Sequence, residues 1–296
     1  MQLRQWQRVI VSAAVLAASV AGFAACAGST GGGQSRAVTP LRRAAGGDLL
    51  ADVKRRGVLV VSTDADYKPQ SYRNADGSWT GFDIDVAREI AKRLGVKPEF
   101  QSVSFDITTA GSWSGRWDVN VDSMAITQGR AKVLYFTEPY YFVPASFAVH
   151  RDSSATSIAD LNGKKIGVGA ATTYEQYLNG QMSTARVPPP SGTYVVSYDT
   201  DMLALQDLAL GNGVRLDGVL TALPTLRAAI AGGMPLRIIS PPVYDDSSAI
   251  AIDRESPVDS RPLLWAIDGI VHDMHRDGTL RRLSMRYYGI DLSVRR

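Results

Sequence analysis

Cysteine and histidine are scarce in this chain of 296 residues, and their scarcity removes two classes of site. Cys26 is the only cysteine, so no internal disulfide can form and the fold must be held by its core. The histidines are His150, His272 and His275. The last two lie three apart on an expected helix, without a recognised zinc spacing, and we interpret them as a solvated helix face. We therefore expect no metal and no cofactor.

The chain also lacks a long, strongly apolar run. The apolar stretch from Val9 to Ala25 is too short and too rich in alanine for a good transmembrane span. It follows a basic start with Arg4 and Arg8 and precedes small residues, which is the layout of a secretory signal. We therefore predict a signal peptide at 1–25.

Cys26 follows Ala24 and Ala25, and this order resembles the lipobox of bacterial lipoproteins, with Phe23 where that pattern usually has leucine. The resemblance implies that Cys26 is lipidated and becomes the new N-terminus. The alternative is an ordinary signal with an incidental cysteine. Residues 26–48, rich in Gly, Ser, Ala and Thr, are then a flexible tether, and we expect the protein on the extracytoplasmic face of the cell membrane.

No block of one charge sign occurs either. The chain has 32 Lys and Arg against 29 Asp and Glu, a net charge of +3 that falls to about +1 without the two arginines of the signal. Nucleic-acid-binding proteins cluster their positive charge, so we expect no nucleic-acid partner. About 250 residues follow the tether, enough for one large or two medium domains.

Strand and helix patterns alternate from Gly57 onward. Residues 58–62 form a continuous apolar run, as in a buried parallel strand, and 82–94 carry apolar residues every four positions before Gly95 stops the helix. Further strands are expected at 96–103, 117–121, 165–169, 194–198, 216–220 and 249–252, and further helices at 174–178, 199–210 and 262–285. This alternation predicts an α/β fold with mostly parallel sheets.

Four stretches carry a resemblance to a known family. They are GVLVVSTDADYKP at 57–69, DG at 76–77 leading to GFDIDVA at 81–87, SMAITQGRAK with FTEPYY at 123–141, and DLNGKKIGV at 160–168. Together they resemble the extracellular solute-binding proteins of polar amino-acid ABC transporters, the bacterial solute-binding protein family 3. The resemblance implies the type II periplasmic-binding-protein fold, with lobe 1 at 49–148 plus 240–296, lobe 2 at 149–239, and hinges near 148–150 and 238–240.

The resemblance also implies the ligand site. The family's ligand arginine falls on Arg130, whose planar guanidinium suits a carboxylate, and Thr127 opens or caps the segment that carries it. Tyr67 and Phe105 align with aromatic residues that sandwich the ligand. The remaining implied ligand-binding residues are Asp64, Ser123, Thr172 and Thr173.

Two positions depart from the family pattern. Ala125 and Ala222 stand where amino-acid binders commonly have a threonine and the aspartate that holds the α-ammonium group. Either another acid replaces that aspartate, with Asp64, Asp122 and the Asp245–Asp246 pair as candidates, or the ligand is not a standard α-amino acid. The Asp245–Asp246 pair could equally be a solvated turn. Trp113 and Trp117 could stack on a ligand, although packing beneath the neighbouring strand is favoured.

These observations predict a membrane-anchored, monomeric protein without enzymatic activity. It would capture a small polar solute, most simply an amino acid or related carboxylate, and deliver it to ABC permease subunits. The alternatives are a sensor that passes ligand binding to a signalling partner, or a dehydratase acting on prephenate or arogenate, as in a few proteins of this fold. The second alternative needs a positioned acid or base, and the sequence assigns none.

Overall fold

The structure is a computed structural model that describes residues 47–182 and 185–295. These residues lie within one of the two units into which the chain divides, residues 38–296. The predicted signal peptide, Cys26 and all but the end of the tether lie outside the described residues, so those assignments stay predictions.

The first sheet contains five strands and combines parallel and antiparallel pairs. Its order is β5–β1–β6–β14–β7, in which β1 pairs in parallel with β5 and β6, and β14 is antiparallel to β6 and β7. The strands are β1 (Val58–Thr63), β5 (Lys97–Ser102), β6 (Val119–Asn120), β7 (Leu134–Phe136) and β14 (Ala251–Asp253). A small antiparallel sheet follows β1 in the chain and contains β2 (Asp66–Tyr67), β3 (Ser71–Arg73) and β4 (Trp79–Thr80).

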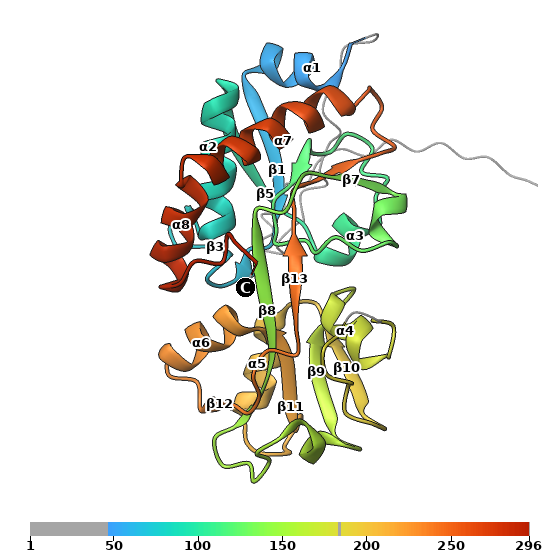
Figure 1. Ribbon diagram of the computed structural model, residues 1–296, viewed down its shortest axis with the longest axis vertical. Helices are drawn as coiled ribbons and strands as arrows, with labels where there is room; N and C mark the ends of the chain where they lie inside the picture. Colours follow the sequence, from blue (N-terminus) through green and yellow to red (C-terminus); the bar gives the residue numbers. More distant parts are fainter. Residues whose placement is uncertain (1–46, 183–184, 296) are drawn as a thin grey trace, which may run out of the picture. The chain divides into compact units, whose positions relative to one another are not determined.

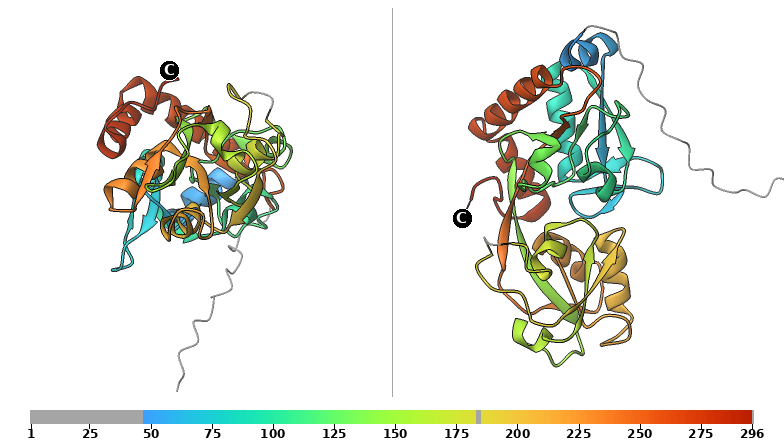
Figure 2. Two further views of the ribbon diagram at one scale, coloured as in Figure 1. Left: turned by 90° about the horizontal axis from the view of Figure 1, so that it is seen from below. Right: turned by 90° about the vertical axis from the view of Figure 1, so that its right-hand side faces the viewer.

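Helices from both ends of the chain pack beside the first sheet. Helix α2 contacts α7 and α8, and α1 contacts α7, so the C-terminal helices cover the N-terminal part of the fold (Figures 1 and 2). The helices are α1 (Leu49–Arg56), α2 (Phe82–Leu94), α3 (Phe105–Thr109), α7 (Arg261–Arg276) and α8 (Thr279–Tyr288), with a 3₁₀ turn at Arg130–Lys132.

The second sheet has the order β10–β9–β11–β8–β12, with β13 also paired to β8. Strands β10, β9 and β11 are parallel, whereas β8 is antiparallel to β11, β12 and β13. The elements are β8 (Tyr141–His150), β9 (Lys165–Gly169), β10 (Tyr194–Tyr198), β11 (Gly218–Ala222), β12 (Leu236–Ile238), β13 (Tyr244–Ser248), α4 (Thr173–Leu178), α5 (Asp201–Ala209) and α6 (Leu223–Ala231), with a 3₁₀ turn at Ile158–Leu161.

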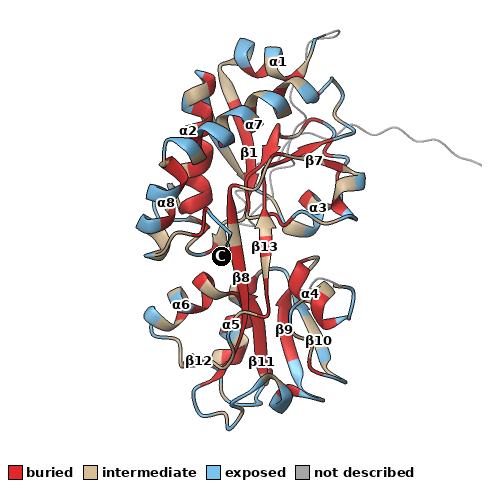
Figure 3. Cartoon of the chain, viewed as in Figure 1, coloured by how far each residue is buried: buried red, intermediate tan, exposed pale blue. Residues whose placement is uncertain are grey.

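Two neighbouring strands connect the two sheets. Strand β8 pairs with β11 from Ala145 to Ala148 and with β13 from Tyr141 to Ala145, so the β8–β13 pair extends from the second sheet toward the first (Figure 1). Strands β8, β9 and β11 are buried along most of their length, while the outer helices expose one face (Figure 3). One continuous apolar cluster extends from the first sheet into the second, with Val61 and Val168 among its members, and a smaller cluster packs beside each sheet.

The α/β prediction is confirmed, but the prediction of mostly parallel sheets is wrong. Both large sheets are mixed, because β14 in the first sheet and β8 in the second pair antiparallel to their neighbours. Several elements match the predicted bounds: helix α2 covers 82–94 and ends at Gly95, whose φ of 76° is left-handed, and β10 covers 194–198. Within the described parts of the chain, none of the helices has the length and apolar composition needed to cross a bilayer.

Candidate ligand-binding site

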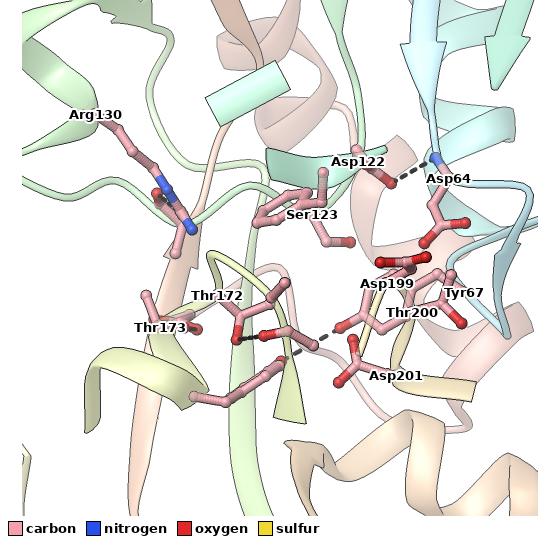
Figure 4. A pocket seen from close by; sticks show the side chains of 16 residues that line it. Asp64, Tyr67, Asp122, Ser123, Arg130, Thr172, Thr173, Asp199, Thr200 and Asp201 are labelled. Carbon is pink, nitrogen blue, oxygen red and sulfur yellow. Dashed lines mark hydrogen bonds between the residues drawn. The ribbon is translucent and has the colours of Figure 1, made fainter. Parts of the chain in front are cut away.

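A pocket with about 480 Å³ of empty space lies where strand ends of the two sheets meet. Its lining residues follow the carboxyl ends of β1, β6, β9 and β10, which is where open α/β sheets place their ligand sites. Figure 4 shows their side chains turned toward a common space. The lining residues are Asp64, Tyr67, Phe105, Asp122, Ser123, Ala125, Arg130, Gly169, Ala170, Thr172, Thr173, Tyr174, Asp199, Thr200, Asp201 and Asp246.

Arg130 is held by four contacts. Thr127 Oγ1 accepts the Arg130 backbone N–H at 3.2 Å, which orders the 3₁₀ turn that carries the side chain. The guanidinium donates from Nη1 to the Ala125 carbonyl (2.7 Å) and from Nη2 to the Ala171 carbonyl (2.8 Å), and it lies 5.0 Å from the centre of the Phe105 ring. A guanidinium has five N–H donors, so donors remain for a carboxylate.

The Arg130 guanidinium lies near one carboxylate of the pocket, that of Asp246. Burial lowers the pKa of Arg130 to about 10, against the attraction of Asp246. Thr173 Oγ1 donates to Asp246 Oδ2 at 2.5 Å, and burial raises the pKa of Asp246 to about 6. Thr172 caps α4 by accepting the Glu175 N–H. The Arg130 guanidinium and the capped start of α4 therefore lie at the same end of the pocket.

Asp64 and Asp122 follow the adjacent parallel strands β1 and β6. The Asp64 N–H donates to Asp122 Oδ1 at 3.0 Å, and the hydroxyls of Thr63 and Ser71 lie 3.4 Å from the same oxygen. Burial raises the pKa of Asp64 to about 6, and burial together with the Asp64 charge raises that of Asp122 well above its usual value. This part of the pocket is strongly acidic.

A buried hydrogen-bond network holds Ser123 in place. Its hydroxyl donates to Asp83 Oδ2 (2.7 Å) and contacts the Tyr141 hydroxyl, while the Tyr140 hydroxyl donates to Asp83 Oδ1 (2.7 Å) and accepts the Ser123 N–H (2.9 Å). Ser123 has a φ of 51°, in the left-handed region. The network holds this conformation, and Asp83, fully buried, has a pKa raised to about 7 by burial.

Helix α5 contributes a further acidic group. Thr200 caps the helix by accepting the Leu203 N–H, so Asp199 precedes the cap and Asp201 is the first helical residue. Asp201 is buried, and burial raises its pKa to about 7. Tyr67 and Tyr174, whose hydroxyl oxygens lie 3.3 Å apart, join the two sheets beside it.

Seven of the eight predicted ligand-binding residues line this pocket, namely Asp64, Tyr67, Phe105, Ser123, Arg130, Thr172 and Thr173. Thr127 does not line it and acts behind Arg130 as a cap. Whether these residues bind a ligand stays a prediction.

Sequence reasoning missed Tyr174 and the run Asp199–Thr200–Asp201. This run directly follows the predicted strand 194–198 and contains a helix-capping threonine, so it lies at the carboxyl end of a parallel strand. Its position at the end of a parallel strand could have identified this run as part of the site, but our prediction assigns it only to the start of a helix.

The structure shows where Ala125 and Ala222, the two positions that depart from the family pattern, lie. Ala222 ends β11, is fully buried and does not line the pocket. Ala125 lines the pocket but offers only its carbonyl, which already accepts from Arg130. Of the Asp245–Asp246 pair, which lies in strand β13 and not in a turn, only Asp246 faces the pocket, while Asp245 pairs with Arg186.

Trp113 and Trp117 pack in the core of the first sheet. They are 0% and 2% exposed, their ring centres are 5.4 Å apart, and neither lines the pocket. The packing interpretation is therefore confirmed. Within residues 47–182 and 185–295, no group of three His, Cys, Asp or Glu side chains is arranged to hold a metal ion.

Comparisons with known proteins agree with this geometry. Residues 59–290 match the sequence model of the bacterial extracellular solute-binding proteins, family 3. The L-cystine-binding protein TcyJ of Escherichia coli (strain K12) is 31% identical over 248 residues, which cover 83% of this chain and 88% of TcyJ.

Solved structures show the same similarity. A mutant of ArgBP from T. maritima superimposes with a TM-score of 0.70 at 28% identity, over 81% of this chain and 99% of ArgBP. The ancestral amino acid-binding protein AncCDT-1, a precursor of cyclohexadienyl dehydratase, gives 0.69 at 28% identity, over 82% of this chain and 100% of that one.

Proposed function

Because this chain belongs to the bacterial extracellular solute-binding proteins of family 3, we propose that it captures an α-amino acid outside the cytoplasm for uptake by an ABC transporter. The pocket described above is the proposed binding site. The permease subunits are the proposed partners, and the lipid anchor at Cys26 is the proposed attachment to the membrane.

The observation that carries this proposal is the charge distribution of the pocket. Arg130 provides a buried guanidinium with free donors, while Asp64, Asp122, Asp201 and Asp246 provide carboxylates. An α-amino acid has both charges that such a pocket complements. A carboxylate without an amine, the alternative left open by Ala222, would leave Asp64, Asp122 and Asp201 without a cation and is less well matched.

We propose that residues 49–148 with 240–296 form one lobe, that 149–239 form the other, and that the hinges lie near 148–150, at the end of β8, and near 238–240, after β12. Contacts that cross between the two sheets support closure around a ligand. They include Arg130 with Ala171, Tyr67 with Tyr174, and Gln70 with Thr225. A closed form of this kind would bury the ligand and create the surface that a permease recognises.

We further propose that the protein binds its ligand without turnover. AncCDT-1 is an amino acid-binding protein and a precursor of a dehydratase, so catalysis by an acidic residue of the pocket is the alternative function to exclude. Incubation of the purified protein with prephenate or arogenate should give no product. Product formation at a rate that depends on Asp201 would contradict the binding-only proposal.

A thermal-shift screen tests the function directly. A ligand at 100 times its Kd adds about 2.7 kcal/mol, which is about 5–10 °C for a protein of this size. We expect such a shift for an amino acid and none for organic acids that lack the amine. The reverse pattern would contradict the proposal.

The Arg130→Ala variant tests the site. We expect its affinity for that amino acid to fall by about 2–5 kcal/mol, because the ligand carboxylate is then buried without its partner. Arg130→Lys is the matched control, since it keeps the charge but loses the bidentate geometry, and it should lose less. Unchanged affinity in both variants would place the carboxylate elsewhere.

A further inference from the structure

The end of the pocket away from Arg130 contains three aspartates from separate parts of the chain. Asp64 follows β1, Asp122 follows β6, and Asp201 begins α5 after β10. Figure 4 shows Asp64, Asp122 and Asp201 on the side of the pocket opposite Arg130. They therefore face a region that the Arg130 carboxylate site does not use.

Asp122 has an oxygen that nothing in the described protein satisfies. The residue is 2% exposed, and the Asp64 N–H and the hydroxyls of Thr63 and Ser71 all approach its Oδ1. Its Oδ2 is buried and has no hydrogen-bond partner among the described residues. Buried carboxylate oxygens normally have partners, so this oxygen indicates a missing donor.

Asp201 has the same property. It is 8% exposed, and its Oδ1 is buried without a close hydrogen-bond partner among the described residues, while the nearby Thr221 hydroxyl and Gly169 N–H only partly offset the effect of burial on its pKa. It is not the cap of α5, because Thr200 fills that role. A helix N-terminus stabilises a charged carboxylate by much less than the cost of burying that charge. The position of Asp201 at the start of α5 therefore does not by itself explain a buried carboxylate here.

The backbone opposite Asp201 leaves room for this carboxylate. A Cβ atom at Gly169 would lie 3.0 Å from Asp201 Oδ2, so any larger residue at 169 would press on the side chain. The glycine and the aspartate therefore fit each other at this wall of the pocket.

The charges around the cluster are negative. Asp64 raises the pKa of both Asp122 and Asp201, and Asp66 raises that of Asp64, while the hydroxyls of Tyr67 and Tyr174 add no cation. Arg130 is the one basic residue among the described residues that line the pocket, and the carboxylate that acts on it is Asp246. The three carboxylates thus lack a cation from the protein.

We propose that Asp64, Asp122 and Asp201 form a subsite for a cationic side chain, so that the ligand is an α-amino acid with a basic side chain. This inference rests on the proposed function, which places the α-carboxylate on Arg130. The side-chain cation supplies the donors that Asp122 Oδ2 and Asp201 Oδ1 lack. A ligand such as L-cystine would bring a second α-amino acid group to this end, whose ammonium is accompanied by a carboxylate that the three aspartates would repel.

Matched ligand pairs test the subsite by calorimetry. L-Arginine is compared with L-citrulline, and L-lysine with L-norleucine, because each pair differs in the charge of the side chain and little in its length. L-Cystine is measured alongside. We expect at least one basic member to bind the wild-type protein at least about 100-fold more tightly than its neutral counterpart and than L-cystine, equivalent to about 2.7 kcal/mol.

The Asp201→Asn variant should reduce that ratio to less than about tenfold, since it keeps the shape and removes the charge. Asp106→Asn is the matched control. Asp106 also lies in the first turn of a helix next to a pocket residue, but it is exposed and does not line the pocket. It should keep the wild-type ratio. A ratio near one in the wild type, or a ratio that Asp201→Asn leaves unchanged, overturns the inference.

Proton release gives a second readout that needs no variant. Because burial raises the pKa of Asp64 to about 6 and of Asp201 to about 7, a bound cation should displace protons at pH 6.5. The binding heat of L-arginine or L-lysine should then depend on the ionisation heat of the buffer. A basic amino acid that binds without proton release overturns the subsite.

The two proposals fail in different ways. Tight binding of neutral amino acids or of L-cystine, without preference for a basic side chain, overturns the subsite and leaves the function standing. Binding of none of the five amino acids overturns both.

Discussion

Replacing Thr225 by valine tests whether a contact between the two sheets stabilises the ligand-bound form. Gln70 lies between β2 and β3, and Thr225 lies on α6 beside the second sheet. Gln70 Nε2 and Oε1 lie 3.1 and 3.2 Å from Thr225 Oγ1, and the two residues are 0% and 1% exposed. Neither lines the pocket, so the change acts on closure and not on ligand contacts.

The expected magnitude follows from the burial. Valine keeps the shape of threonine but removes the hydroxyl, which leaves the Gln70 amide buried without its partner in the closed form. In an open form, water would solvate the same amide. The cost of about 1–3 kcal/mol therefore acts on the closed form alone and should raise the Kd about 5- to 150-fold.

Calorimetry and stopped-flow dissociation measure the effect. We expect the change to appear mainly as faster dissociation, with the melting temperature of the ligand-free protein little altered. Thr225→Ser is the matched control, because it keeps the hydroxyl and loses a methyl group. Equal affinities for wild type and Thr225→Val, or equal losses in both variants, would refute the reasoning.

Four further predictions concern the pocket, the core and Cys26. Binding of L-arginine or L-lysine should be full above about pH 8 and weaken as the pH falls through 7 and 6, because protonation of Asp201 (pKa about 7) and Asp64 (pKa about 6) removes charges that hold the cation; a titration from pH 8 to pH 5 measures this, and constant affinity would contradict it. Over the same range the free energy of unfolding of the ligand-free protein should rise as the pH falls, since these raised pKa values mean that the folded state binds protons more tightly. Trp113→Ala should cost about 3–5 kcal/mol of stability in urea unfolding with little change in ligand affinity, because Trp113 fills the core and not the pocket; a large loss of affinity at unchanged stability would contradict this. Cys26→Ser should abolish the incorporation of a labelled lipid precursor, because the thiol that would carry the lipid is removed, and labelling of the variant at the wild-type level would contradict lipidation at Cys26.

Local patterns in the sequence predicted most of the fold. Helix α2 was predictable because its apolar residues recur at helical spacing and Gly95 adopts a left-handed φ that ends it. The strand at 194–198 was likewise marked by its own residues and by the helix cap at Thr200. Each of these features depends on interactions within a few residues, which is why a single sequence contains them.

The acidic end of the pocket was not predictable in this way. Asp64 and Asp201 are 137 positions apart, and they approach only because the strand ends of two different sheets meet. Similarly, Asp246 and not Asp245 faces the pocket, because neighbouring residues of β13 point to opposite sides and the pairing with β8 decides which side is which.

The sequence by itself therefore predicted helix α2, the strands that run in parallel and the family resemblance, which implies the guanidinium that would hold a carboxylate, but it did not predict strand β13, which pairs with β8. Only the tertiary structure decided that Thr127 acts behind Arg130, that the tryptophans pack away from the pocket, and that three aspartates gather at its far end. The reason is physical. Periodicity and capping are local properties of the chain, whereas convergence of side chains depends on how separately formed sheets pack against each other.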